Sequence, residues 1–284
     1  MTAAGSGGDR LIDSYDALLV DLDGVVYLGD EPIAGAAQAL DEARAGDVRV
    51  VFVTNNAART ATEVAAGLTA MGVPASPDEV LTSSMAAADL LGHRLAPGAS
   101  VLVVGGAGLR EPITAAGLRP VAVADDTTAA VVQGWSPDLT WALLAEASVA
   151  LRRGVPWIAT NRDATLPSPR GPLPGNGSMV AALALATGRE PEVVGKPEPA
   201  LLLAATAAAK ASRPLVVGDR LDTDIAGANA AGLPSLLVLT GVSQSAQLKD
   251  APPEQRPTYV GRGLAALLEP PIPFETALTQ LALD

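Results

Sequence analysis

Short apolar runs that alternate with alanine-rich stretches are the feature that most constrains the fold of this 284-residue chain. The runs have the length of buried strands, and the stretches between them, of about 10–15 residues, are typical of helices. Strands that alternate with such helices form βαβ units, in which the strands are parallel. We therefore predict an α/β protein with a doubly wound, Rossmann-like parallel sheet. The predicted strands are residues 17–22, 48–54, 80–82, 101–104, 129–132, 157–160, 214–218, 235–239 and 258–260.

Two of the predicted helices begin with specific signals. Thr60 followed by Glu63 has the spacing of a capping box. Ser136 followed by Pro137 predicts an N-cap and a first-turn proline. A last helix is expected in the proline-rich tail that begins at Pro270.

The middle of the chain has strands and helices of its own. Three predicted strands lie between Ser83 and Pro191, in a segment that also holds the glycine- and proline-rich residues 167–177. A second α/β domain inserted into the first accounts for this arrangement. We predict a discontinuous core domain, residues 1–82 and 192–284, and an inserted α/β cap domain, residues 83–191.

Composition narrows the class of partner. The formal net charge of −12 argues against a nucleic acid, because binding to its backbone requires clustered Lys and Arg. No apolar run approaches the roughly 20 residues of a membrane span, and residues 1–10 lack the apolar stretch of a signal peptide. The chain has no cysteine, which excludes disulfides and thiolate chemistry. We expect a cytoplasmic protein whose partner is neither a nucleic acid nor a membrane.

Two acidic residues lie where the first predicted strand ends. Asp21 and Asp23 are two positions apart, so their side chains point to the same side of an extended backbone. Gly24 then allows the chain to turn sharply, and ligands bind at this end of the strands in a parallel sheet. One acid can attack phosphorus while the other transfers a proton. The alternative is a pair of acids that caps the next turn.

One group of polar residues lies at the end of the second predicted strand, and a lysine stands where a later helix is expected to begin. Thr54, Asn55 and Asn56 offer a hydroxyl, two amides and loop backbone to a phosphoryl group, although Thr-Asn-Asn is also ordinary turn chemistry. Lys196 is a compact charge that can contact a phosphate, and a solvated helix start is its alternative. Alone, neither motif is specific.

A further group of acids follows the seventh predicted strand. Asp219, Asp222 and Asp224, with Asp21 and Asp23, make five carboxylates at strand ends. If these strands are neighbours, repulsion would raise the pKa values of the carboxylates unless a cation is bound. Oxygen ligands and a phosphate substrate suit Mg²⁺. We therefore predict a Mg²⁺ site.

These four elements, in this order along residues 11–262, resemble the haloacid-dehalogenase-like hydrolases. The insert between the threonine and lysine elements resembles the subgroup with a large α/β cap. The resemblance implies a Mg²⁺-dependent phosphomonoesterase that forms an aspartyl-phosphate intermediate. In this interpretation Asp21 is the nucleophile, and Asp23 is the general acid and then the general base.

The same resemblance implies two sets of ligands. The metal ligands would be Asp21, the main-chain carbonyl of Asp23, and Asp219, with Asp224 in support. The phosphoryl group would be held by Thr54, Asn55, Asn56 and Lys196.

The substrate expected from the resemblance is a small phosphorylated metabolite. Residues 160–167 and 175–178 resemble the subgroup's substrate loop, and Leu166 stands where pyridoxal phosphatases have His. Residues 173–186 and 216–241 are most similar to bacterial glycerol 3-phosphate phosphatases, so glycerol 3-phosphate is the predicted substrate. The alternatives are phosphoglycolate, pyridoxal phosphate, a nucleoside monophosphate and p-nitrophenyl phosphate.

Other functions are open alternatives. A phosphonatase would need a reactive lysine in the cap, and all three lysines, Lys196, Lys210 and Lys249, lie outside residues 83–191. A phosphomutase of the same fold is a second enzyme alternative. A non-catalytic phosphate-binding regulatory protein is the alternative from another class, and the intact set of acids argues against it. The protein partner that we consider is a second copy of this chain, bound through the cap in a homodimer.

Overall fold

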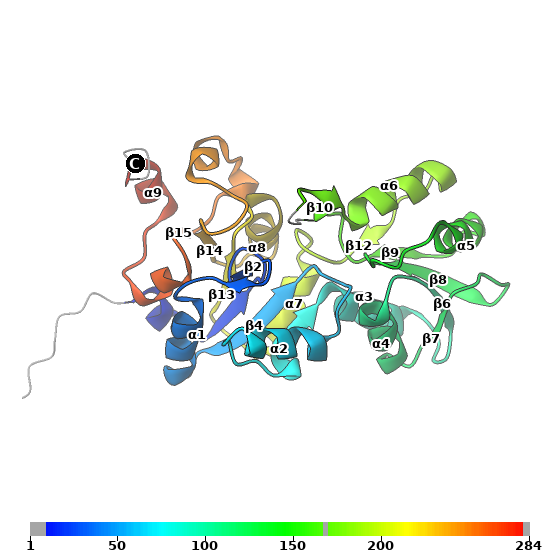
Figure 1. Cartoon of the computed structure of the whole chain (residues 1–284), viewed down its shortest axis with the longest axis horizontal. Coiled ribbons are helices and arrows are strands. Elements are labelled where there is room, and N and C mark those ends of the chain that lie inside the picture. Colours follow the sequence, from blue (N-terminus) through cyan, green and yellow to red (C-terminus); the bar gives the residue numbers. More distant parts are fainter. Residues whose placement is uncertain (1–9, 167–169, 281–284) are drawn as a thin grey trace, which may run out of the picture. The chain divides into compact units, whose positions relative to one another are not determined.

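The computed structural model describes residues 10–166 and 170–280 (Figure 1). Residues 1–9 and 167–169, which some sequence-based expectations include, lie outside this description. The chain divides into two compact units, and the division passes through β4 (Arg49–Thr54), α2 (Ala61–Ala70) and α7 (Ala200–Ala208). The first unit is Met1–Phe52, Leu68–Pro74 and Ala205–Asp284, and the second is Val53–Gly67 and Ala75–Ala204.

The first unit is built on a parallel sheet with the strand order β15-β14-β13-β1-β4. Val20 at the end of β1 pairs with Val217 of β13 on one side and with Phe52 of β4 on the other. Because the chain continues to opposite sides of β1, the sheet has a topological switch point between β1 and β13, the usual place for a ligand. The other strands of this sheet are β1 (Ala17–Val20), β13 (Pro214–Gly218), β14 (Ser235–Val238) and β15 (Tyr259–Gly261).

Every residue of β1, β13 and β14 is buried, as expected for strands that are covered on both faces. One buried cluster joins Leu237 and Val260 of the sheet to Ile225, Leu248 and Phe274. The remaining elements of this unit are the hairpin of β2 (Tyr27–Leu28) and β3 (Glu31–Pro32), and the helices α1 (Ala36–Ala45), α8 (Ala226–Ala230) and α9 (Phe274–Gln280). Helix α9 confirms the predicted last helix.

The second unit has a parallel sheet of five strands in the order β12-β9-β8-β6-β7. Its strands are β6 (Ser100–Val104), β7 (Arg119–Val121), β8 (Thr128–Gln133), β9 (Trp157–Ala159) and β12 (Glu192–Val193). Strand β5 (Val80–Thr82) and the antiparallel hairpin of β10 (Thr165–Leu166) and β11 (Leu173–Pro174) also belong to this unit. Its complete helices are α3 (Ser83–Arg94), α4 (Ala107–Ala115), α5 (Trp141–Arg152) and α6 (Asn176–Thr187).

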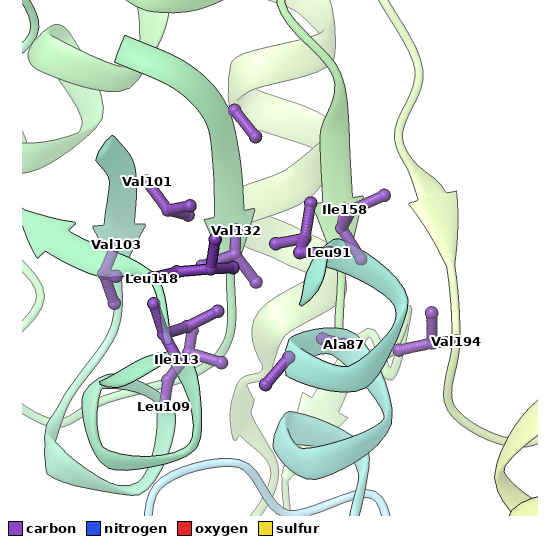
Figure 2. Packing of buried hydrophobic residues seen from close by; sticks show 12 residues of the cluster. Ala87, Leu91, Val101, Val103, Leu109, Ile113, Leu118, Val132, Ile158 and Val194 are labelled. Carbon is purple, nitrogen blue, oxygen red and sulfur yellow. The ribbon is translucent and has the colours of Figure 1, made fainter. Parts of the chain in front are cut away.

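Alternate residues of the central strands in this sheet pack against different helices. Val101 and Val103 of β6 join Val132 of β8 in a buried cluster with side chains of α3 and α4 (Figure 2). Leu102 and Val104 of β6 belong to a second cluster, with side chains of α5 and α6. The alternation follows from the two-residue period of a strand. It makes the second unit a three-layer α/β/α structure.

The observed elements confirm the predicted fold class and all nine predicted strands. The capping box is confirmed: the Thr60 N–H donates to Glu63 Oε2 (2.8 Å), and the Glu63 N–H donates to Thr60 Oγ1 (3.2 Å). The prediction of Ser136 as an N-cap is wrong. Thr140 caps α5 instead, while Ser136 Oγ accepts the N–H of Asp138 in the preceding turn (3.2 Å). Among the described residues, no helix has the length and apolar character that crossing a membrane requires.

Candidate active site

Three acidic side chains converge at the carboxyl ends of β1 and β13. Asp21 directly follows β1 and Asp219 directly follows β13, and the parallel register brings these strand ends to the same edge of the sheet. Asp224 lies in the π-helical turn Leu221–Ile225. One carboxylate oxygen from each of the three residues lies within 4.8 Å of the others. Asp219 and Asp224 are buried, and Asp21 is half-buried.

Backbone groups of the surrounding loops hold the two buried carboxylates. The N–H of Val242 donates to Asp219 Oδ2 (2.6 Å), and the N–H of Arg220 donates to Asp224 Oδ2 (3.1 Å). The two acids are therefore oriented by main-chain groups.

Glycine allows the loops to approach this closely. Gly24 has a φ of +80°, and a Cβ at this position would lie 2.5 Å from Asp219 Oδ2. A Cβ at Gly241 would also overlap the carboxyl group of Asp219. The hydroxyl of Thr240 donates to the Gly24 carbonyl (2.6 Å) and joins the loop after β14 to the turn after Asp21. A larger residue at either glycine would displace Asp219.

The donor set of this cluster fits a small divalent cation. It offers carboxylate oxygens alone, close enough for one ion to bind all three. Gathering three carboxylates, two of them buried, is costly unless a positive charge compensates. Asp21 and Asp219 were predicted as metal ligands, and the structure brings their carboxylates together. It adds Asp224, whose direct contact with the metal the sequence left undecided, whereas Asp222 is exposed and pairs with Arg220 (2.7 Å).

Asp23 lies outside the carboxylate cluster although it is only two residues from Asp21. Its side chain is exposed, and the hydroxyl of Tyr27 donates to its Oδ2 (3.3 Å). The N–H of Gly24 donates to the Tyr27 carbonyl (2.8 Å), which closes the turn. Tyr27 is a residue of this site that the sequence does not predict. The one feature that could have indicated it is its place at the end of the Asp-Gly-Val-Val-Tyr segment, residues 23–27.

In the second unit, the carboxamide of Asn55 holds the main chain of Lys196 from both sides. The Lys196 N–H donates to Asn55 Oδ1 (2.8 Å), and Asn55 Nδ2 donates to the Lys196 carbonyl (2.9 Å). Asn55 Nδ2 also donates to Asp163 Oδ2 (3.3 Å). A Cβ at Gly195 would lie 2.5 Å from Asn55 Oδ1, so glycine is needed for this close approach. Lys196 is buried, and its Nζ donates to the Val53 carbonyl (3.1 Å).

Thr54 and Asn56 form a compact turn beside Asn55. Thr54 is buried and its Oγ1 accepts the N–H of Asn56 (3.0 Å), while the exposed Asn56 accepts the N–H of Ala58 through its Oδ1 (2.9 Å). Thr54, Asn55, Asn56 and Lys196 all belong to the second unit. Their predicted role in binding phosphate stays a prediction. For Asn55, the hydrogen bonds leave that role to its main chain.

Comparison with known proteins identifies the family. Residues 18–119 match the family described as haloacid dehalogenase-like hydrolase, and residues 193–267 match a second family of HAD-hydrolase-like proteins. The chain belongs to the haloacid dehalogenase-like hydrolases, which confirms the predicted membership.

Named relatives cover most of the chain. It is 53% identical over 257 residues to D-glycerol 3-phosphate phosphatase of Mycobacterium tuberculosis, covering 90% of this chain and 72% of the relative. It is 39% identical over 243 residues to acid sugar phosphatase of Staphylococcus aureus, covering 84% and 93%.

Solved structures of phosphatases are also similar to this chain. The glycerol phosphate phosphatase of Mycobacterium tuberculosis in complex with magnesium superimposes with a TM-score of 0.89 at 53% identity, covering 92% of this chain and 78% of that one. The p-nitrophenyl phosphatase of Archaeoglobus fulgidus gives a TM-score of 0.82 at 31% identity, covering 90% and 98%.

Proposed function

We propose that this chain is a Mg²⁺-dependent phosphomonoesterase that hydrolyses glycerol 3-phosphate. The observation that carries the proposal is the cluster of Asp21, Asp219 and Asp224, three carboxylates arranged for one cation. The 53% identity to D-glycerol 3-phosphate phosphatase supports the choice of substrate. Phosphoglycolate, pyridoxal phosphate, nucleoside monophosphates and p-nitrophenyl phosphate are the alternatives to be compared with it.

In the proposed reaction, Asp21 and Asp23 divide the chemistry between them. The half-buried carboxylate of Asp21 attacks phosphorus, the bond to the alcohol oxygen breaks, and an acyl-phosphate forms on Asp21. Asp23 gives its proton to the departing alkoxide. It then takes a proton from the water that hydrolyses the acyl-phosphate, which returns both acids to their starting forms. The exposed position of Asp23 beside Tyr27 supports exchange of its proton with solvent.

The remaining residues of the proposed site hold charge. Mg²⁺, when bound by Asp21, Asp219, Asp224 and the main-chain carbonyl of Asp23, offsets the negative charge of the phosphate. Lys196 and the main chain around Thr54, Asn55 and Asn56 hold the phosphoryl oxygens. Positioning and charge stabilisation supply most of the catalysis in phosphoryl transfer.

We further propose that residues 83–191 act as a cap that selects the alcohol part of the substrate. We also propose that the enzyme is cytoplasmic and that it forms a homodimer through this cap. Trp141 of α5 and Leu185 of α6 support the dimer, because they are 82% and 90% exposed on two helices that pack together. A sedimentation experiment on the wild type and on Trp141→Glu tests it. A wild type that stays monomeric at all concentrations would contradict the dimer.

Phosphate release from a panel of esters tests the proposed reaction. The panel contains glycerol 3-phosphate and the four alternatives, each assayed with Mg²⁺ and with a chelator. We expect the highest kcat/KM for glycerol 3-phosphate and no turnover in the chelator. A better ester would replace the substrate, and turnover in the chelator would overturn the metal requirement. If no ester is hydrolysed, the non-catalytic binding protein is the better interpretation.

A further inference from the structure

Asn161 is a buried amide of the second unit that the proposed reaction does not use. It lies two residues after β9 and is 5% exposed. Its Nδ2 donates to the Asn55 carbonyl (2.8 Å), and its Oδ1 accepts the N–H of Asp163 (3.1 Å). Asn176 Nδ2 donates to the main-chain carbonyl of Asn161 (2.8 Å). Both ends of the Asn161 side chain therefore bind protein, in a segment that resembles a substrate loop.

Asn55 is the residue on which these contacts converge. Its carbonyl accepts two hydrogen bonds, one from Asn161 Nδ2 and one from Ser83 Oγ (2.8 Å). A carbonyl oxygen has two lone pairs, so these donors fix the plane of the Asn55 peptide. The side chain of Asn55 in turn binds both the N–H and the carbonyl of Lys196. The contacts form one continuous path from Asn161 to Lys196.

We infer that Asn161 is a positioning residue, which sets the place of Lys196 by fixing the peptide of Asn55. The inference rests on the proposed role of Lys196 as a ligand of the phosphoryl group. Without the Asn161 donor, the Asn55 carbonyl keeps only Ser83 Oγ of its two partners. The Asn55 peptide is then held less firmly, and the position at which its side chain binds Lys196 shifts. A shift of about 1 Å in such a group costs as much as 100-fold in rate.

The inference predicts an effect that does not depend on the alcohol part of the substrate. Every ester presents the same phosphoryl group to Lys196, so a displaced Lys196 lowers kcat/KM by the same factor for all of them. If Asn161 contacted the substrate directly, its loss would affect some alcohols more than others. The ratio between two unlike esters therefore separates the two roles.

The test compares Asn161→Ala and Asn161→Asp with the wild type. Kinetics are measured with glycerol 3-phosphate and with p-nitrophenyl phosphate, beside the melting temperature. We expect kcat/KM to fall by about 10-fold or more for both esters equally, mostly through kcat. Asn161→Asp should lose more, because its carboxylate faces the Asn55 carbonyl. The matched control is Gln133→Met, which removes another buried amide of this unit, bonded to Trp157 and not to Asn55.

Three outcomes would overturn the inference. The first is an unequal loss for the two esters, and the second is an unchanged kcat/KM at a lowered melting temperature. The third is a loss in Gln133→Met as large as in Asn161→Ala. If the Asn161 variants do not fold, Ser83→Ala removes the other donor to the same carbonyl and should give a smaller, equally ester-independent loss. A wild type inactive on every ester would instead contradict the proposed function.

Discussion

The two units hold their chemically active residues by different means. In the first, Asp21 and Asp219 stand at the ends of neighbouring parallel strands, and a backbone N–H and two close glycines set the carboxylate of Asp219 in place. In the second, Lys196 is held through side-chain amides that come from distant parts of the chain. Strand ends are dictated by local sequence, whereas an amide network depends on the finished tertiary structure. The comparison predicts that loss of a carboxylate in the first unit stops the reaction, whereas loss of an amide that positions Lys196 in the second lowers its rate.

The largest effect is expected for Asp219→Ala. Removing this carboxylate takes away one of the three cation ligands, so Mg²⁺ affinity and turnover should both fall, turnover by at least about 100-fold. Calorimetric titration with Mg²⁺ and the phosphate-release assay measure the two effects. Asp222→Ala is the matched control, because this acid lies three residues further along and is exposed. An Asp219→Ala enzyme that binds Mg²⁺ like the wild type would break the assignment of the first unit.

A smaller effect, confined to substrate choice, is expected for Leu166→His in the second unit. Leu166 is half-buried in β10, where pyridoxal phosphatases are expected to have His. The ratio of kcat/KM for pyridoxal phosphate over that for glycerol 3-phosphate should rise by about 10-fold. The requirement for Mg²⁺ should stay the same. An unchanged ranking of the panel esters would show that this hairpin does not select the substrate.

The smallest effect is expected for Glu192→Gln, on stability alone. Arg94 at the end of α3 binds Glu192 of β12 through two hydrogen bonds (2.5 and 2.9 Å), and this bonding lowers the pKa of the Glu192 carboxyl. Because the folded-state pKa lies below the unfolded one, the pair stabilises the fold above the unfolded-state pKa. The stabilisation is lost as the pH falls through the folded-state value. Both side chains are about half exposed, so the change should cost less than about 1 kcal/mol near pH 7.

Urea unfolding of the wild type and Glu192→Gln at neutral pH and near pH 3 measures this difference. The gap in the free energy of unfolding should close at the lower pH, with kcat/KM unchanged at neutral pH. A gap that widens on acidification would contradict the direction of the pKa shift.

The predictable part of the site is its strand ends. A run of buried residues followed by Asp indicates both the strand and the edge at which it ends, so Asp21 and Asp219 could be placed from the sequence. The sequence does not decide whether Asp224 contacts the metal, because the π-helical turn that brings Asp224 to the cluster has no local signature. The hydrogen bonds between the Asn55 side chain and the Lys196 main chain join residues 141 positions apart, and no pattern around either residue indicates them.

The N-cap of α5 shows the same limit at short range. Ser136 and Thr140 both offer a side-chain oxygen near the helix start, and the sequence favoured Ser136 because Pro137 follows it. The structure uses Ser136 in a turn and Thr140 as the cap. Local chemistry allowed both arrangements, and tertiary packing decided between them.

Trapping the phosphorylated enzyme tests the central claim, that Asp21 is the nucleophile, most directly. Enzyme is mixed with Mg²⁺ and with glycerol 3-phosphate that carries the radiolabel on its phosphoryl group. The mixture is then quenched in acid, and the protein is digested. The account predicts a label on the peptide that contains Asp21, released by hydroxylamine as from an acyl-phosphate, and no label in Asp21→Asn. A label on another residue, or one that persists in Asp21→Asn, would contradict it.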